Sequence, residues 1–192
     1  VIENGGQVHW ARDAEEACQI IAGICKDVQA KTVTKGKSMV SEEMHLNPVL
    51  EEAGMMVVET DLGEYIVQLA GETPSHIIAP AVHKTREQIT DLFHEHHSPL
   101  GYTDRVTQRE ALVNEARSVL RERFVTADVG ITGANFLVAE TGANVIVTNE
   151  GNGDLTSCLP RVHIVTAGIE KIVPSLDDLA VLLRVLARSA TG

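Results

Sequence analysis

Aromatic residues are scarce in this sequence and make up 3% of its 192 residues, so a buried core must rely on aliphatic side chains. The chain also lacks an excess of basic residues, and its formal net charge is −11. Phosphate contacts need clustered Lys and Arg, so this charge argues against a nucleic-acid partner. Apolar runs such as residues 176–186 contain charges and are too short to span a membrane. No signal-peptide pattern opens the sequence, and we expect a cytoplasmic chain without a membrane span.

Cysteine is also scarce: the sequence has Cys18, Cys25 and Cys158. Three cysteines fit reduced thiols better than a disulfide framework. Cys18 and Cys25 share one face of a predicted helix with Ile21 and Ala22, which indicates buried core thiols. A metal ion or an iron–sulfur cluster would need further ligands at close spacing, and the sequence does not supply them. We therefore expect no metal site and no cofactor held by this chain.

The common cofactor and nucleophile motifs are missing as well. The sequence has no GxGxxG dinucleotide fingerprint and no GxxxxGK[ST] phosphate loop. It also has no GxSxG motif for a nucleophilic serine. Hydride transfer with a dinucleotide bound by this chain is therefore not supported.

The length of 192 residues suits a single domain with a substantial core. Helical patterns alternate with short β-branched segments in the first half, which is typical of a parallel sheet flanked by helices. In the second half two strands meet at Thr141 and Gly142, which predicts a β-hairpin. We therefore predict an α/β fold with a mainly parallel sheet, flanking helices and this hairpin. The predicted helices are 13–26, 41–54, 85–95, 107–123 and 176–188, and the predicted strands are 32–34, 55–58, 75–79, 127–131, 136–139, 144–148 and 162–166.

The first candidate site follows the predicted strand 32–34. Lys37 and Ser38 come just after it and before a helix, and ligands of open α/β sheets bind at the carboxyl ends of strands. These two residues could bind a carboxylate or a phosphate, helped by amides of the following helix. The alternative is a solvated turn.

The second candidate site is an acidic segment that follows the strand 55–58. Its carboxylates, Glu59, Asp61 and Glu64, lie close together in sequence around Gly63. They could bind a cation or hold a lysine of a partner. A polar surface loop is the alternative, since acidic loops are common.

The third candidate site begins at the end of the strand 127–131. Gly133 follows Thr132 and would allow a ligand to approach the backbone closely. Glu140 lies beside Thr141 and Gly142 in an otherwise apolar stretch, where it could contact a ligand. The alternative for Glu140 is a strand-end residue that faces solvent or pairs with a basic group.

The same stretch ends in a glycine- and asparagine-rich turn. Gly151 and Gly153 alternate with Asn152 and follow Asn149 and Glu150. Such a turn can take left-handed backbone geometry and present successive amides to an anion. Glu150 could act as a nucleophile, a base or a ligand-orienting group. The alternative is a tight turn between strands.

The histidines differ in their value as candidates. The cluster 94–97 lies at a helix end without HExxH spacing, which favours a solvated surface cap over a metal site. His83 follows Pro80 and a predicted strand end, so it is a better site candidate. His163, close to Arg161, is either a core-strand histidine or part of a cleft.

Several of these segments together, in this order along nearly the whole chain, resemble the LUD (lactate-utilisation) domain found in the iron–sulfur subunit of bacterial L-lactate oxidation complexes. The segments are KSMVSEE (37–43), ETDLGEY (59–65), PSHI (74–77), HKTR (83–86), the stretch 130–153, LPRVH (159–163) and RSATG (188–192).

The resemblance implies a fold similar to the ribose-phosphate isomerase and CoA-transferase group. It also implies that residues 1–192 form one LUD domain of a longer protein, whose C-terminal ferredoxin-like domain, outside this chain, holds [4Fe–4S] clusters. Partner subunits would join it in oxidising L-lactate to pyruvate, and a homo-oligomer is a further alternative. In the CoA-transferase-like fold a glutamate in a glycine- and asparagine-rich turn lies at the ligand cleft. Glu150 resembles that glutamate.

The mechanistic hypothesis built on this resemblance is a cleft for a small anionic metabolite such as a 2-hydroxy acid. Lys37, Arg161 or turn amides would neutralise its carboxylate. His83, His163 or Glu150 would accept its hydroxyl proton. Two other classes stay open: a scaffold that binds a ligand or docks partner subunits without catalysis, and acyl or sugar-phosphate chemistry.

Overall fold

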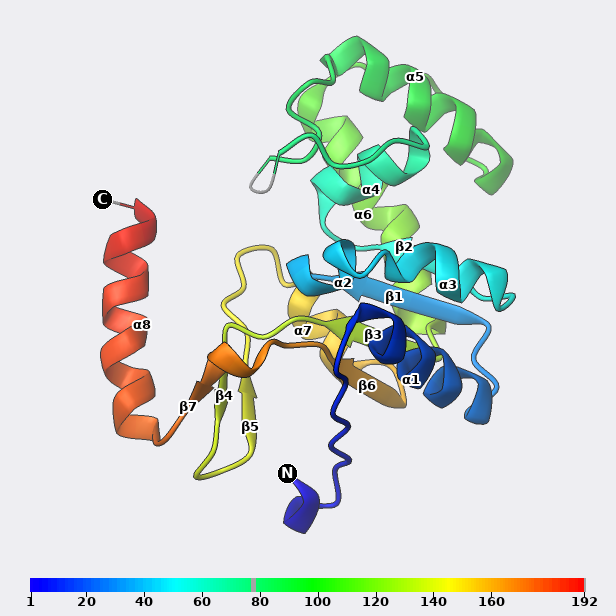
Figure 1. Ribbon diagram of the computed structural model, residues 1–192. Coiled ribbons are helices and arrows are strands. Elements are labelled where there is room, and N and C mark those ends of the chain that lie inside the picture. Colours follow the sequence, from blue (N-terminus) through cyan, green and yellow to red (C-terminus); the bar gives the residue numbers. More distant parts are fainter. Residues whose placement is uncertain (77–78, 192) are drawn as a thin grey trace.

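The central sheet has four parallel strands in the order β2–β1–β3–β6 (Figure 1). A computed structural model describes residues 1–76 and 79–191 of the chain. Parallel pairing places the carboxyl ends of all four strands at one edge of the sheet. This arrangement confirms the predicted α/β fold with a mainly parallel sheet. The strands are β1 (Thr32–Gly36), β2 (Met56–Glu59), β3 (Val129–Thr132) and β6 (Val162–Val165).

Helices cover both faces of this sheet (Figure 1). Successive side chains of a strand point to opposite faces. In β2, Val57 therefore joins the core with α1 and α3, whereas Val58 joins the core with α4, α5 and α6. Burial on both faces explains why β1 and β3 read as continuous buried runs rather than as alternating patterns. The helices are α1 (Ala14–Asp27), α2 (Met39–Glu43), α3 (Leu46–Glu52), α4 (Leu62–Leu69), α5 (Arg86–His97), α6 (Arg109–Thr126), α7 (Asn152–Cys158) and α8 (Leu176–Thr191).

A second, smaller sheet of three strands lies beside the central one, in the order β5–β4–β7. The antiparallel pair β4 and β5 confirms the predicted hairpin, and β7 pairs parallel to β4. Helix α8 packs on this small sheet through Leu179, which joins Val138 and Val173 in a separate core. The strands are β4 (Phe136–Val138), β5 (Ala143–Val145) and β7 (Ile172–Val173), and short 3-10 helices occur at Ile2–Asn4, Ser98–Leu100 and Ile169–Lys171.

The helix predicted over residues 41–54 is in fact two helices. Between α2 and α3 the backbone of His45 takes a left-handed conformation with a φ of 52°. An α-helix cannot continue through this conformation. The break turns α3 so that Leu46 and Leu50 are fully buried in the core with α1.

The strand predicted over residues 75–79 is wrong for the residues that the structure describes. Ser75, His76 and Ala79 belong to no strand, and residues 77–78 of this prediction lie outside the described residues. The backbone N–H and the hydroxyl of Ser75 both donate to the carbonyl oxygen of Pro80, at 3.1 and 2.9 Å.

Two segments whose sequences indicate loops contain helix starts. Helix α4 begins inside the acidic segment 59–64, and α7 begins inside the turn 149–153, with Asp61 and Gly151 at the positions before the first helical residue. Asp, Asn and Gly are favoured both in turns and at helix N-termini, so these sequences do not distinguish the two.

Within residues 1–76 and 79–191, no helix is both long enough and apolar enough to cross a membrane.

Candidate functional site

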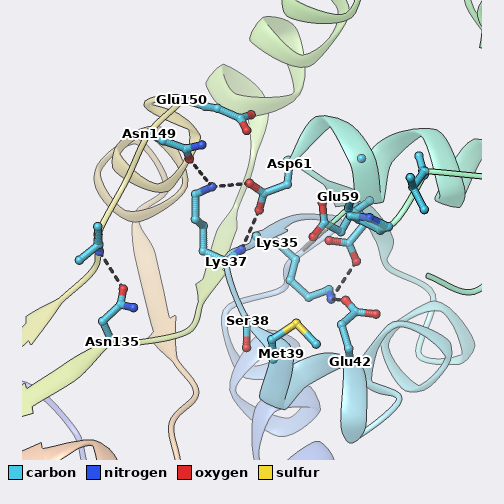
Figure 2. A pocket seen from close by; sticks show the side chains of 18 residues that line it. Lys35, Lys37, Ser38, Met39, Glu42, Glu59, Asp61, Asn135, Asn149 and Glu150 are labelled. Carbon is cyan, nitrogen blue, oxygen red and sulfur yellow. Dashed lines mark hydrogen bonds and ion pairs between the residues drawn. The ribbon is translucent and has the colours of Figure 1, made fainter. Parts of the chain in front are cut away.

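A pocket of about 500 Å³ opens at the carboxyl edge of the central sheet. It is formed where the turn after β1 meets the start of α4, the segment 79–82 and the connection that leads from β5 to α7. Figure 2 shows its side chains converging from these elements. The lining residues are Lys35, Gly36, Lys37, Ser38, Met39, Glu42, Glu59, Asp61, Gly63, Glu64, Ala79, Pro80, Ala81, Val82, Asn135, Val147, Asn149 and Glu150.

Lys37 lies between Asp61 and Asn149 in this pocket (Figure 2). Its ammonium group donates to Asp61 Oδ1 at 2.5 Å and to Asn149 Oδ1 at 3.0 Å. Its backbone N–H donates to Asp61 Oδ2 at 2.9 Å. The backbone of Lys37 is left-handed, with a φ of 57°, which is uncommon for a residue with a side chain. The surrounding contacts hold this conformation, as is usual for strained residues at functional sites.

Gly133 explains how the turns after β1 and β3 can pack so closely. A Cβ atom at Gly133 would lie 2.3 Å from the carbonyl oxygen of Lys37 and 3.0 Å from Cα of Ser38. The close approach at Gly133 in the structure is made by the backbone of Lys37, and the approach of a ligand there stays a prediction. Ser38 is the residue before α2 and caps this helix, since its hydroxyl accepts from the N–H of Ser41 at 3.1 Å.

Asp61 connects three segments of the pocket wall. Besides its two bonds with Lys37, its Oδ1 accepts from the Asn152 side-chain amide at 2.7 Å. Asn152 is buried and also donates to the backbone oxygen of Thr60 at 3.2 Å. The turn after β1, the start of α4 and the start of α7 are thus fixed to one carboxylate.

Lys35 is the largest fully buried side chain of the described residues, and it is one of the residues that line the pocket. Its ammonium group pairs with Glu42 and with Glu59, the latter at 2.8 Å between Nζ and Oε1. It also donates to Ser41 Oγ at 3.2 Å, while Asn47 donates to Glu59 Oε1 at 2.6 Å. Burial alone would lower the pKa of Lys35, but the charges of Glu59 and Glu42 raise it above its ordinary value. Lys35 therefore stays charged.

Sequence reasoning missed the role of Lys35. The register of the sheet pairs Lys35 directly with Glu59 of β2, which brings the two charges together in the interior. A lysine within a buried strand indicates that an acidic partner is present. Which residue is the partner depends on the order of the strands, and the sequence does not give this order.

Glu64 lies half-buried on the first turn of α4, in the same pocket. Burial raises the pKa of its carboxyl group to about 7, with a further increase from the nearby charge of Asp61. Glu64 is therefore present in both its charged and its neutral form near neutral pH. Gly63 beside it lets Pro80 approach, since a Cβ atom there would lie 2.9 Å from Pro80 Cγ.

The structure brings together eight of the predicted site residues in this pocket. They come from the first and second candidate segments and from the turn near residue 150. These eight residues are Lys37, Ser38, Glu59, Asp61, Gly63, Glu64, Asn149 and Glu150.

The other predicted site residues do not line the pocket, and several have structural contacts. Glu140 Oε2 accepts from the N–H of Leu176, 3.1 Å away, where α8 begins. Thr141 and Gly142 form the hairpin turn between β4 and β5, with a left-handed φ of 69° at Gly142. Gly151 precedes the first residue of α7, and Gly153 packs against Thr148 and Ile146.

Arg161 and the two candidate histidines also lie outside the pocket lining. Arg161 directly precedes β6, so it lies at the amino edge of the parallel sheet, where it donates to the backbone oxygen of Val28. His83 is held by Glu72 and Ser75, each 2.7 Å away. His163 Nε2 lies 2.7 Å from the hydroxyl of Thr132.

His163 predicts a pH dependence of stability. Burial lowers the pKa of the folded imidazole below its ordinary value of about 6.5. Below that pH the unfolded chain takes up a proton that the folded chain resists, so the free energy of unfolding should fall as pH falls from 7 to 5. Urea unfolding at several pH values should show that the free energy of unfolding falls less in His163→Gln than in the wild type. The matched control is His9→Gln, in the exposed N-terminal segment; an equal fall in both variants would contradict the prediction.

The cluster 94–97 is not a solvated cap throughout, because His97 is fully buried. Its Nδ1 lies 2.7 Å from Glu115 Oε1, and its Nε2 lies 2.9 Å from the Tyr65 hydroxyl. The ring also stacks on the ring of Tyr65. This network ties α5 and α6 to α4, the helix that carries Glu64.

The cysteines of this chain do not fit an iron–sulfur cluster. Cys18 and Cys25 are free and buried in the core, as predicted, whereas Cys158 is exposed on α7. Burial raises the pKa of the Cys25 thiol to about 11 and also raises that of Cys18, so neither is a ready thiolate ligand. Within the part of the chain that the structure describes, no three His, Cys, Asp or Glu side chains are grouped to hold a metal ion.

Comparison with known proteins gives a match over the whole chain. The family model described as LUD domain matches residues 1–192. Relatives named Lactate utilization protein B from Geobacillus kaustophilus, Bacillus subtilis and Bacillus velezensis are 50%, 50% and 51% identical over 193 aligned residues. Each alignment covers 100% of this chain and 40% of the relative, so the chain spans about two fifths of their length. No solved structure matches.

Proposed function

The chain belongs to the LUD domain family, and from this premise we propose that it acts in lactate utilisation, as the LUD domain of a longer iron–sulfur protein that oxidises L-lactate to pyruvate. The names of the relatives and the share of their length that the chain covers support this proposal. Because the cysteines of this chain do not fit a cluster, the [4Fe–4S] clusters would be held outside it. Partner subunits, a homo-oligomer and a cytoplasmic location stay predictions.

We assign to this chain the binding of a small carboxylate, and Lys37 is the observation that carries the assignment. An ammonium group has three N–H donors, and Lys37 uses two of them, on Asp61 and Asn149. The third donor is left for a ligand in the pocket. A charge-assisted bond from it to a carboxylate is roughly twice as strong as a neutral hydrogen bond.

The rest of the pocket suits a 2-hydroxy acid with a small apolar group. Met39, Val82 and Val147 line it together with the polar side chains and would contact a methyl group. Of the three residues expected to accept the hydroxyl proton, Glu150 lines the pocket, whereas His83 and His163 do not. We therefore assign that proton to Glu150.

Lys37→Ala is the variant that tests the binding proposal. In the intact protein it should weaken L-lactate binding at least ~10-fold, the effect of losing one charge-assisted bond of about 1.5–3 kcal/mol. Isothermal titration of L-lactate measures this change. The control is Lys26→Ala, which removes a charge from the exposed end of α1 and should bind as the wild type does.

The same protein, purified without oxygen with its partner subunits, gives a second measurement. L-lactate should bleach the visible absorption of its iron–sulfur clusters, and Lys37→Ala should bleach more slowly. If the clusters are present but L-lactate does not bleach their absorption, L-lactate is not the substrate. Equal binding by Lys37→Ala and the wild type would remove Lys37 from the site.

A docking scaffold is the second candidate, and the exposed apolar residues of the pocket favour it. Met39, Val82 and Val147 all line the pocket and are all exposed. Exposed apolar side chains rimmed by polar residues are typical of protein–protein contact sites. Absence of L-lactate binding by the wild type, together with co-purification of partner subunits, would favour this function over ligand binding.

A further inference from the structure

The charges that line the pocket do not balance. Two ammonium groups, those of Lys35 and Lys37, face five carboxyl groups. Each ammonium group is already in an ion pair: Lys35 with Glu42 and Glu59, and Lys37 with Asp61. The five carboxyl groups are those of Glu42, Glu59, Asp61, Glu64 and Glu150.

Glu64 and Glu150 remain without an ion pair among the described residues, but their surroundings differ. Glu150 is exposed, so that water screens its charge. Glu64 is half-buried next to Asp61 and in the same pocket wall as Glu59. A carboxylate in this position is repelled by its neighbours and poorly hydrated.

An anion that binds at Lys37 would add negative charge to this unbalanced pocket. Inside a protein, charges interact several times more strongly than they do in water, so the repulsion from Glu64 would oppose binding. A metal ion could offset the added charge, but among the described residues no three His, Cys, Asp or Glu side chains are grouped to hold one. A proton is another counter-charge, and the half-buried carboxyl group of Glu64 can take one up.

We propose that a small carboxylate anion enters this pocket together with one proton, and that Glu64 holds this proton in the complex. The inference rests on the proposed function, because it concerns the same ligand site. The neutral carboxyl group of Glu64 removes one negative charge from the wall and becomes a hydrogen-bond donor. The pKa of Glu64, about 7 in the unliganded chain, allows this protonation near neutral pH.

The groups around Glu64 are consistent with this assignment. Its charged neighbours are Asp61 before α4, Glu59 at the end of β2, and Lys37 after β1. Lys37 is the cation among them, and it is shared with Asp61 and with the incoming anion. Where α4 packs against α5 and α6, the titratable side chains are hydrogen-bonded to one another: His97 is bonded to Tyr65 and to Glu115.

Titration of L-lactate into the intact protein tests the inference. In buffers with different ionisation enthalpies, the heat of binding should show the uptake of about one proton per anion at pH 8 and much less at pH 6. The dissociation constant should rise by up to about tenfold per pH unit above pH 7.

Glu64→Gln places a neutral side chain of the same shape in the wall. This variant should bind L-lactate without proton uptake and with the same affinity at pH 6 and pH 8, and it should bind more tightly than the wild type at pH 8. Glu43→Gln is the matched control, since it removes the same charge from an exposed position of α2 outside the pocket lining. It should keep the proton uptake of the wild type.

The possible failures are distinguishable. Binding of L-lactate without proton uptake at pH 8, or proton uptake that persists in Glu64→Gln, would overturn the role of Glu64 and leave the proposed function intact. Absence of binding by the wild type at both pH values would overturn the proposed function and this inference together.

Discussion

Replacing Lys35 by methionine is expected to lower the free energy of unfolding by about 3–5 kcal/mol at pH 7, although methionine has a similar length. The change removes the cation that compensates Glu59, whose side chain is buried. An unpaired carboxylate in the interior loses its hydration without gaining a partner, and this is the main source of the loss. Urea unfolding of the chain measures it.

The pH dependence separates this electrostatic cause from poor packing. Burial raises the pKa of Glu59, and the charge of Lys35 opposes that increase, so Glu59 should take up a proton more readily once Lys35 is gone. Because a neutral Glu59 needs no cation, the loss in Lys35→Met should be smaller at pH 4 than at pH 7.

Two further variants complete the test. Lys35→Met with Glu59→Gln removes both charges and should recover more than half of the loss. Lys26→Ala, at the exposed end of α1, should change stability by no more than about 0.5 kcal/mol. A loss in Lys35→Met that is the same at both pH values and is not recovered by Glu59→Gln would show that packing is the cause.

Replacing Gly130 by alanine is expected to cost ~3 kcal/mol or more, or to prevent folding. A Cβ atom at Gly130 would lie 1.8 Å from the backbone oxygen of Thr156 in α7 and 3.1 Å from Pro160 Cγ. A backbone oxygen in a helix cannot rotate away as a side chain can. Helix α7 would have to shift from β3, which would also pull Asn152 from Asp61.

Gly23→Ala is the matched control for this substitution. Gly23 lies inside α1, and a Cβ atom there would meet no atom within 4 Å apart from the neighbouring backbone of α1 itself. Alanine is the better helix former, so this change should stabilise the chain by about 0.5–1 kcal/mol. Thermal or urea unfolding compares the two variants. If Gly130→Ala were as stable as the wild type, α7 would be free to move on the sheet.

The architecture of the chain could largely be predicted from the sequence, because it depends on local patterns. Alternating helical and β-branched segments indicate the parallel sheet, and Thr141 with Gly142 indicates the hairpin. Where the local signal is ambiguous the prediction is wrong, as in the single helix over residues 41–54, which is broken at His45. The break allows α3 to be buried in the core, so it depends on tertiary packing and not on the local sequence.

The candidate site could be predicted in part, for a similar reason. Lys37 and Asp61 each follow a strand, and the carboxyl edge of a parallel sheet brings such positions together. Lys35 and His97 could not be found in this way. Each is a polar side chain made acceptable in the interior by an acidic partner, Glu59 or Glu115, on another element. The order of strands and the packing of helices decide those partners.

The carboxylate of Asp61 has one more consequence, which concerns rigidity. Because it fixes the turn after β1, the start of α4 and the start of α7 at once, these segments are already ordered before a ligand arrives. A preorganised site binds more tightly, since little conformational entropy is lost on binding. Without this carboxylate, the opposite walls of the pocket would have to be ordered again in every binding event.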